Sequence, residues 1–403
     1  MRLLFVVMPD SVHAVRWVEL LAGRGWEIHV FPATHADWHP EWSNIVAYST
    51  NPGGVRRVDG GPLHSSVRQR QLRPIREPRR EPGPLDRLVP GRRNDRAERL
   101  AEVIRIVKPD LIHSHEIQTC AYLTLDARER LGNRLPPWIA TNWGSDIYLF
   151  GRLEAHAERV RTVMRSIDYY GCECVRDIGL GREFGFAGPV LPVIPIAGGY
   201  DLDELRSHPQ VRPTSARRVV ALKGYQHWAG RGLVGLRAIE LAADVLQDYE
   251  IVIYAGLSDR TVIGLASTLT AQATGLRLTM LPFVEHGEIM QLFGRARISI
   301  GLSISDAIGQ SFLESIAMGS FPIQSNTGCA NEWIEDSVSG ILVHPDEPEQ
   351  VAAALRRAVA DDELIDRAAA INANTVRERL DRSKIRSRVV AMYEQLVAGG
   401  NAS

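Results

Sequence analysis

Short apolar runs alternate with amphipathic stretches along most of the chain. Residues 2–8 predict a strand buried on both faces, because every residue after Arg2 is apolar and none alternates with a polar one. Residues 12–22 repeat apolar side chains at helical spacing, and Gly23 and Gly25 follow as helix-stop signals. Residues 27–31, which carry Ile28, Val30 and Phe31, predict a second strand. A strand, a helix and a strand over so short a stretch predict a βαβ unit and therefore a parallel sheet.

The same alternation continues through both halves of the chain. In the first half it predicts helices at residues 95–107 and 119–131, and strands at 110–113, 138–141, 169–172 and 190–195. The pattern restarts after Gly198 and Gly199, with strands predicted at 219–222, 250–254, 278–281, 298–302, 321–324 and 341–343. Helices are predicted between them at 233–246, 259–270, 287–293, 309–318 and 331–335, and a charged helical tail at 349–397.

Two successive α/β halves in 403 residues predict an α/β protein of two Rossmann-like, doubly wound domains facing a central cleft. We expect an N-terminal domain at residues 1–200 and a C-terminal domain at residues 201–375. Residues 376–403 are expected to form a C-terminal helix that packs back across the domains. Ligands of doubly wound sheets bind at the carboxyl ends of the strands, so candidate chemistry is sought there.

Residues 51–99 break the pattern, because they carry 13 arginines against six acidic residues and several prolines. The first interpretation is a solvated, flexible Arg/Pro-rich insertion, which we place at residues 51–95. The alternative is a basic surface that attracts an anionic acceptor or phospholipid headgroups. The stretch contains no aromatic residue on which bases could stack, so nucleic acid is not an expected partner.

Composition argues against a nucleic-acid-binding, a disulfide-rich and a membrane-spanning protein. The net charge of −1 creates no general field for nucleic acid or an anionic membrane. Cys120, Cys172, Cys174 and Cys329 lack the spacing of a disulfide framework or a zinc knuckle, so reduced thiols are expected. The apolar run at the beginning is shorter than a signal peptide requires, and no apolar run reaches membrane-spanning length. We expect a cytoplasmic protein whose only membrane contact is peripheral, through the basic insertion.

The most specific segment is residues 303–345. A predicted strand ends at Leu302, a loop carries Asp306, and a predicted helix begins near Gly309 and carries Glu314. A helix start offers backbone N–H groups and the positive end of the dipole, which suits a diphosphate or sugar hydroxyls. Alternatively, the two carboxylates only cap the helix.

Two further segments carry candidate chemistry. Lys223 and Arg231 flank a glycine-containing loop after the first strand of the second half, where two cations could neutralise a diphosphate; a solvated turn is the alternative. His115 follows a strand of the first half, with His113 two residues before it. Asp201 and Asp203 form an Asp-x-Asp pair at the domain junction, which we do not interpret as a metal site.

The segment from Asp306-Ala-Ile-Gly309 through Leu313-Glu314 to Pro322-Ile323 resembles the hallmark of the retaining glycosyltransferases of family 4, which have the GT-B fold. By this resemblance Asp306 contacts the donor sugar and Glu314 holds the ribose hydroxyls. Asp replaces the family's first Glu. Lys223 and Arg231 occupy the places of the family's arginine and lysine with the types exchanged. His115 stands where the family has a histidine near the reacting sugar, and Asn142–Asp146 resembles a stretch expected on the acceptor side.

The resemblance implies a metal-independent hexosyltransferase that retains the anomeric configuration. The catalytic candidates are His115, Asp306, Lys223 and Arg231, and the donor-binding candidates are Lys223, Arg231, Asp306, Gly309, Gln310, Ser311 and Glu314. No cofactor or metal is expected beyond a nucleotide-diphosphate sugar, a UDP- or GDP-sugar, as co-substrate. The acceptor is a glycan, a lipid-linked sugar or a small molecule. The alternatives are a GT-B nucleotide-sugar epimerase, a glycoside phosphorylase, and a non-catalytic nucleotide-sugar-binding protein.

Overall fold

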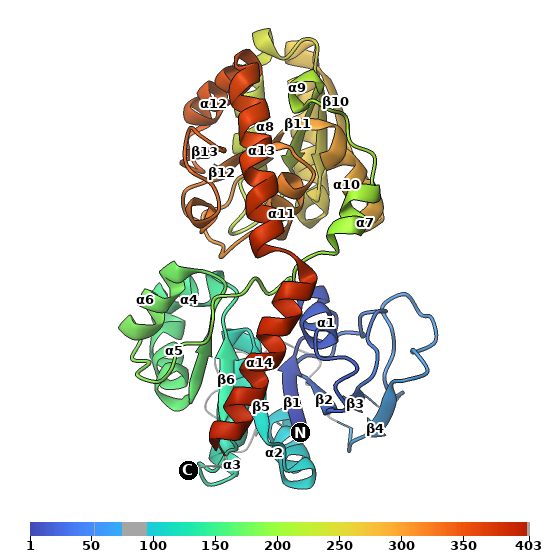
Figure 1. The fold of residues 1–403 in the computed structure, drawn as a ribbon, viewed down its shortest axis with the longest axis vertical. Coiled ribbons are helices and arrows are strands. Elements are labelled where there is room, and N and C mark those ends of the chain that lie inside the picture. Colours follow the sequence, from blue (N-terminus) through green and yellow to red (C-terminus); the bar gives the residue numbers. More distant parts are fainter. Residues whose placement is uncertain (52, 75–94, 401–403) are drawn as a thin grey trace. The chain divides into compact units, whose positions relative to one another are not determined.

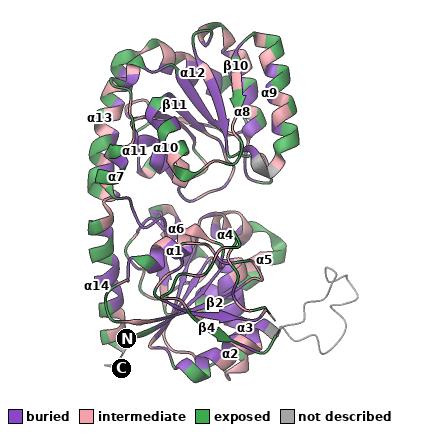
Figure 2. Ribbon diagram, turned by 90° about the vertical axis from the view of Figure 1, so that its right-hand side faces the viewer, coloured by how far each residue is buried: buried purple, intermediate pink, exposed green. Residues whose placement is uncertain are grey.

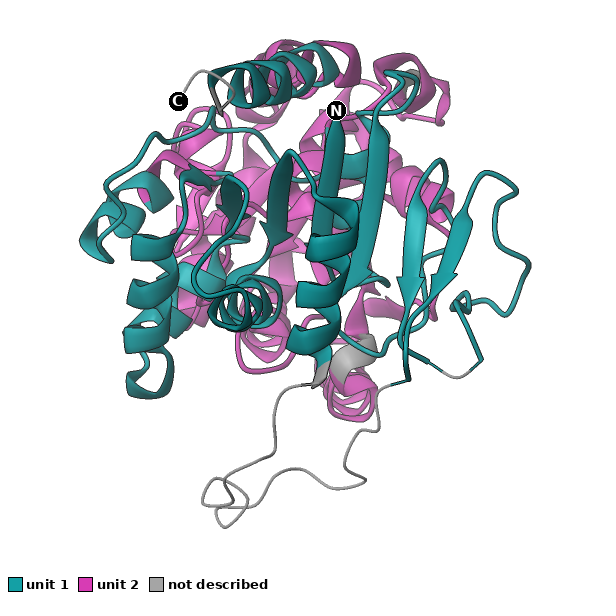
Figure 3. Ribbon diagram, turned by 90° about the horizontal axis from the view of Figure 1, so that it is seen from below, with its two compact units in different colours: residues 1–173, 177–198, 386–403 teal, residues 174–176, 199–385 magenta. Residues whose placement is uncertain are grey.

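The computed structural model describes residues 1–51, 53–74 and 95–400. The chain divides into two units, drawn in different colours in Figure 3. Unit 1 consists of Met1–Glu173, Asp177–Gly198 and Arg386–Ser403, and unit 2 consists of Cys174–Arg176 and Gly199–Ile385. The expected boundary at residues 200/201 compares with an observed boundary at Gly198/Gly199, and the chain returns to unit 1 at Arg386.

Unit 1 contains a seven-stranded parallel sheet in the order β4-β3-β2-β1-β5-β6-β7 (Figure 1). Its strands are β1 (Arg2–Val7), β2 (Glu27–Pro32), β3 (Val46–Ser49), β4 (Arg68–Gln71), β5 (Leu111–His115), β6 (Trp138–Thr141) and β7 (Tyr169–Gly171). Its helices are α1 (Val12–Glu19), α2 (Asp95–Val107), η2 (Ile117–Ala121), α3 (Tyr122–Arg130), α4 (Ser145–Tyr148), η3 (Phe150–Arg152) and α5 (Glu154–Ser166). α6 (Val175–Glu183) begins in unit 2 and continues in unit 1.

Unit 2 contains a six-stranded parallel sheet in the order β10-β9-β8-β11-β12-β13. Its strands are β8 (Val219–Lys223), β9 (Glu250–Tyr254), β10 (Arg277–Met280), β11 (Ala296–Gly301), β12 (Phe321–Ser325) and β13 (Ile341–Val343). Its helices are α7 (Leu202–Ser207), η4 (Thr214–Ala216), α8 (Gly232–Leu241), η5 (Ala243–Val245), η6 (Gly256–Asp259), α9 (Arg260–Thr274), α10 (His286–Arg295), α11 (Gln310–Ala317), η7 (Ala330–Glu332), α12 (Pro348–Ala360) and α13 (Asp362–Arg379).

The core of each unit explains why the chain folds in this way. Most strands of both sheets are buried, as Figure 2 shows, because helices cover the faces of a parallel sheet. In unit 1, Val6 of β1 lies in register with Phe31 of β2 and Ser114 of β5. In unit 2, β8 pairs with β9 and β11 at the centre of the sheet. The carboxyl ends of β5 and β8, where His115 and Lys223 lie, are therefore central positions of their sheets.

The last helix, α14 (Arg382–Gly400), begins in unit 2, and its residues from Arg386 onward belong to unit 1. There the Arg386 guanidinium donates to the carbonyl oxygens of Leu20 and Ala22. Tyr393 is fully buried, and its hydroxyl accepts a hydrogen bond from Trp17 Nε1 at 3.0 Å. The predicted tail helix thus packs on the first α/β unit through a buried polar contact.

Several sequence predictions differ from the structure, and helices α5 and α6 were not predicted. Residues 190–195 form no strand, and Val190 makes only a single bridge to Tyr170. β3 and β4 were not predicted, and β4 lies inside the expected insertion at 51–95, where it is the fully exposed edge of the sheet. The expected helix at 331–335 is the short turn η7. Residues 75–94, the rest of the expected insertion, lie outside the described residues.

Candidate functional site

The amino end of α11 is the centre of the candidate site in unit 2. Gly309 is its N-cap residue, with extended backbone, and makes no side-chain hydrogen bond to the amides of the first turn. Gln310 and Ser311 are the first two residues of the helix, and both are partly exposed. Since a helix start attracts anions through its amides and dipole, this position can receive a phosphate or sugar oxygen.

Glu314 is held in place by two side chains. It is 4% exposed, and its Oε1 accepts hydrogen bonds from His286 Nε2 and Gln310 Nε2, each at 2.8 Å. His286 is the first residue of α10, and its side chain is 48% exposed. Neither hydrogen bond uses Oε2, so the second carboxylate oxygen retains the capacity to accept from a ligand hydroxyl.

Asp306 lies in the loop between β11 and α11 and is partly buried. Burial raises the pKa of its carboxyl, while the charges of Lys223, Arg176 and His227 act in the opposite direction. Arg176 also fixes the loop itself, because its Nη2 donates to the Asp306 carbonyl oxygen at 2.9 Å. A carboxylate near the permanent cations Lys223 and Arg176 and beside a helix start is suited to binding a polar, partly anionic ligand.

The two predicted cations differ in their surroundings. Lys223 ends β8, and its Nζ lies 4.6 Å from the centre of the Tyr225 ring. Arg231 forms an ion pair with Asp346, with 2.6 Å between Nε and Oδ1, and donates to the carbonyl oxygen of Gly230 at 3.0 Å. Lys223 therefore acts electrostatically on Asp306, whereas the charge of Arg231 is already paired with a carboxylate.

The loop from Lys223 to Arg231 folds back on itself tightly. Gln226 and Arg231 form an antiparallel bridge, and Gly230 bridges to Ser303. A Cβ on Gly230 would lie 2.5 Å from the Tyr225 carbonyl oxygen, so only glycine allows this close approach. The bridge to Ser303 connects the cationic loop with the start of the segment that carries Asp306. The structure thus brings together Lys223, Asp306 and the amino end of α11 within unit 2.

His115, the catalytic candidate of unit 1, ends β5 and is fully buried. Its ring packs edge-on against Phe5 and Trp17 and lies 4.3 Å, between ring centres, from His113. Neither of its ring nitrogens has a hydrogen-bond partner among the described residues. Burial, with a further contribution from His13, lowers the pKa of His115 to about 3, so the ring is neutral.

Other residues singled out from the sequence have structural partners. His113 bonds to the Tyr393 hydroxyl at 2.5 Å and to Thr141 Oγ1 at 2.7 Å. Asp146 accepts from the amides of Ile117 and Trp143, so its carboxylate orders the loop that contains it. Asp201 caps α7 by accepting from the amides of Asp203 and Glu204.

Two glycosyltransferase family models match parts of the chain. Residues 239–375 match the family model described as glycosyl transferases group 1, and residues 89–172 match the model described as glycosyl transferase 4-like. The first match contains α11 with its flanking loop, and the second contains β5. Residues 239–375 are therefore a group 1 glycosyltransferase domain. Among curated proteins, no sequence matches the chain.

Solved structures show that this glycosyltransferase has the GT-B fold, as predicted. An α,α-trehalose 6-phosphate synthase from Burkholderia multivorans is similar with a TM-score of 0.71 and 15% identity, covering 100% of both chains. Sucrose-phosphate synthase from Thermosynechococcus elongatus is similar with a TM-score of 0.67 and 16% identity, covering 99% of this chain and 100% of its own. Anabaena Alr3699/HepE, solved with UDP-glucose, has a TM-score of 0.66 and 13% identity, covering 98% and 100%.

Sequence reasoning about the glycosyltransferase missed three side chains beside the predicted residues. His227 lies in the cationic loop, where burial lowers its pKa and the charges of Lys223 and Arg231 lower it further. This residue could have been found from its place in the loop. Arg176 and His286 contact the loop of Asp306 and the carboxylate of Glu314, but they are 130 and 28 residues away in the chain. No local pattern indicates these two contacts.

Among the described residues, no helix combines the length and the apolar character that crossing a bilayer requires.

Proposed function

We propose that the protein transfers a sugar from a nucleotide-diphosphate sugar to an acceptor, with retention of the anomeric configuration and without a metal ion. One observation carries the proposal: the amino end of α11 lies between the Asp306 loop and the held carboxylate of Glu314, with Lys223 acting on Asp306. In this arrangement Lys223 and the α11 amides suit an anionic leaving group, Asp306 suits a sugar hydroxyl, and Glu314 suits the ribose diol.

The diphosphate is assigned to the cations and the helix start. Departure of a nucleoside diphosphate concentrates negative charge on phosphate oxygens, which the Lys223 ammonium and the first-turn amides of α11 stabilise. Arg231 is assigned the second cationic contact. Its guanidinium is paired with Asp346. To bind the incoming phosphate, Arg231 must either donate to both Asp346 and the phosphate or release Asp346. Arginine suits this exchange because its several donors address two acceptors together.

The sugar and the ribose are assigned to the two carboxyl groups. Asp306 accepts from a hydroxyl of the donor sugar, and its raised pKa brings it closer to sharing a proton with that hydroxyl. Glu314 accepts from the ribose hydroxyls through Oε2, since its other oxygen is occupied. No carboxylate is assigned as a nucleophile. Retention is therefore attributed to a short-lived ion pair in which the leaving phosphate takes the acceptor's proton on the face it departs from.

His115 is assigned to the reaction centre. A neutral imidazole donates through one nitrogen and accepts through the other, and neither nitrogen of His115 is satisfied by a described residue. Sugar hydroxyls supply both missing partners. Because the ring is fully buried, contact with a sugar requires a neighbouring side chain to move.

The donor is proposed to be a UDP- or GDP-sugar, and the similarity to Alr3699/HepE, which was solved with UDP and with UDP-glucose, favours the uridine nucleotide. A thermal-shift screen of nucleotide sugars tests the donor, since a ligand that binds the folded state raises the melting temperature. Transfer is then measured with the best donor and a panel of sugar acceptors, and the anomeric configuration of the product is read by NMR. An inverted product would contradict retention, and absence of stabilisation by every nucleotide sugar would contradict the proposal as a whole.

A further inference from the structure

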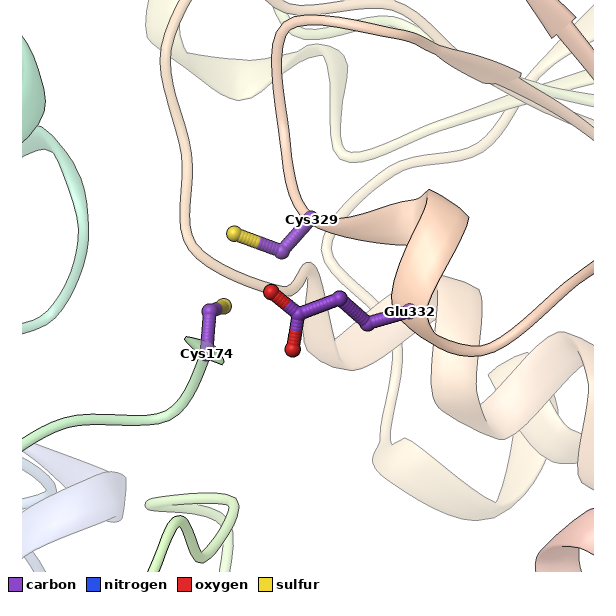
Figure 4. Close-up of side chains that lie close together, drawn as sticks. All are labelled: Cys174, Cys329 and Glu332. Carbon is purple, nitrogen blue, oxygen red and sulfur yellow. The ribbon is translucent and has the colours of Figure 1, made fainter. Parts of the chain in front are cut away.

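Two buried thiols and one carboxylate of unit 2, none of them among the proposed donor residues, converge beside the Asp306 loop. Cys174 and Cys329 are 0% and 1% exposed, and Glu332 is partly exposed. One ligand atom from each of the three side chains lies within 4.8 Å of the other two. Figure 4 shows the side chains pointing toward one another, with Cys174 on one segment and Cys329 and Glu332 on another. The cysteines are thiols and not halves of disulfides.

The spacing is close to that of a tetrahedral metal site. With zinc–sulfur distances of about 2.3 Å, two ligand atoms on a tetrahedral zinc ion lie about 3.8 Å apart. The observed limit of 4.8 Å is therefore within reach of small side-chain rotations. Cys329 and Glu332 sit three residues apart across the turn η7, so one short turn presents two of the three groups. The partial exposure of Glu332 supplies a path by which an ion can enter.

The carboxylate already has the outer contacts of a metal ligand. Glu332 Oε2 accepts from the amide of Val175 at 2.8 Å, and Oε1 accepts from the amide of Arg176 at 3.0 Å. Carboxylates that bind metals are commonly oriented by such hydrogen bonds, and each oxygen keeps a second lone pair. The two amides belong to the residues directly after Cys174. They therefore fix the carboxylate against the segment that carries the first thiol.

The surrounding charges suit a divalent ion bound by two thiolates. Two thiolates and one carboxylate carry three negative charges, which a divalent cation reduces to one. Arg176 and Arg379 are placed nearby: Arg176 follows Val175, and Arg379 Nη1 donates to the Glu332 carbonyl oxygen at 2.5 Å. The first turn of α6, which begins at Val175, adds the positive end of a helix dipole.

We propose that Cys174, Cys329 and Glu332 bind Zn²⁺, with water as the fourth ligand. Thiolates select zinc over the hard cations Mg²⁺ and Ca²⁺. The water leaves one coordination position open, but we assign the ion to holding two segments together and not to sugar transfer. It ties the Cys174–Arg176 segment to the Cys329–Glu332 turn. Both segments contact the Asp306 loop. Arg176 donates to the Asp306 carbonyl oxygen, and the Cys329 amide donates to the Ala307 carbonyl oxygen at 2.7 Å.

The test is metal binding by the full chain, independent of any activity. The protein is stripped of metal under a phosphine reductant and titrated with Zn²⁺ against a chromogenic chelator, and with Co²⁺ to detect thiolate-to-cobalt charge-transfer absorption. We expect one equivalent of Zn²⁺, a cobalt spectrum with thiolate ligation, and a higher melting temperature of the zinc-loaded chain. Cys174→Ser and Cys329→Ser should each weaken zinc binding about 100-fold or more, because loss of a direct ligand costs at least as much as loss of an outer-shell partner.

Cys172→Ser is the matched control, because Cys172 is buried two residues before Cys174 and lies outside the cluster. It should leave the zinc affinity unchanged. Melting temperatures of the metal-free variants show whether each one folds, and Glu332→Gln tests the carboxylate without removing a sulfur ligand. The proposal is overturned if the stripped chain binds no stoichiometric zinc, if the Cys174→Ser/Cys329→Ser double variant binds zinc as the wild type does, or if cobalt binds without thiolate absorption.

Discussion

Glu314 Oε1 accepts a hydrogen bond from His286 Nε2 at 2.8 Å, although the two residues belong to different helices. Gln310 Nε2 donates to the same oxygen, so two donors fix one carboxylate orientation. The carboxylate is therefore positioned before any ligand arrives. Preorganisation of this kind lowers the ordering cost of binding.

Removing Glu314 or Lys223 should nearly abolish transfer. Glu314→Ala deletes the proposed ribose contact, and Lys223→Ala deletes a cation that stabilises the departing diphosphate. We expect each change to lower turnover about 10²-fold or more, which is the scale of losing one preorganised contact. Steady-state kinetics with the best donor measure the loss, and Glu363→Ala, on the exposed side of α13, is the control. Near-normal turnover in both variants would contradict the assignment of Glu314 and Lys223 to the donor site.

Replacing His286 should affect donor binding more than chemistry. His286→Asn loses the hydrogen bond to Glu314 Oε1 and leaves the one from Gln310. A hydrogen bond to a charged group contributes about 1.5–3 kcal/mol, so with one donor retained we expect a rise of about tenfold in the donor KM with kcat changed far less. In the Glu314→Ala background the same substitution should have no further effect. Additive effects of the two substitutions would show that His286 does not act through Glu314.

Chelation of divalent cations, zinc included, should leave transfer intact. The proposed stabilisation of the diphosphate uses Lys223, Arg231 and helix amides, and Asp201 is occupied in capping α7. Activity after EDTA treatment should stay within about twofold of the untreated value, a change worth less than 0.5 kcal/mol. A complete loss that Mg²⁺ or Mn²⁺ restores would assign the diphosphate to a metal. Zn²⁺ as the only restoring ion would instead implicate the thiolate site.

The buried His115 should make unit 1 sensitive to acid. Its pKa is lowered from 6.5 to about 3 by burial, so between these values the unfolded chain binds a proton that the folded chain does not. The contribution of the neutral His115 ring to the free energy of unfolding is fully present above pH 6.5. It is lost as the pH falls toward 3, with a slope of up to about 1.36 kcal/mol per pH unit. In His115→Phe, denaturation midpoints should fall less steeply with acidification. His64→Asn, which changes an exposed histidine, should follow the wild type. An unchanged slope in His115→Phe would contradict the burial of a neutral ring.

Periodicity predicted most of the buried strands because parallel strands covered on both faces are short apolar runs. β6, β9 and β13 have the predicted bounds. The prediction at 190–195 was wrong because Pro189, Pro192 and Pro195 remove backbone donors, so an apolar run cannot join a ladder. β4 was missed for the opposite reason, since its sequence, RQRQ, is wholly polar and pairs only along one exposed edge.

The residues of the candidate site also fall into those that the sequence predicted and those that it could not. Asp306, Gly309 and Glu314 were predictable because one strand–loop–helix segment of fewer than twenty residues carries them all. Arg176 was not predictable, because it reaches the Asp306 loop from a segment 130 residues earlier. The pairing of Arg231 with Asp346 across 115 residues was equally hidden, and it changes the electrostatics of a residue predicted to neutralise a diphosphate.

The most direct test of the account is the dissociation constant of a nucleoside diphosphate, measured by isothermal titration calorimetry on the full chain in EDTA-containing buffer. UDP and GDP are each titrated into the wild type, Lys223→Ala, Glu314→Ala and the Glu363→Ala control. The account predicts that at least one nucleotide binds the wild type and the control, and that each site variant binds it at least about tenfold more weakly, a loss of about 1.4 kcal/mol. Equal affinity in all four proteins, or binding that appears only when Mg²⁺ or Mn²⁺ is added, would contradict it.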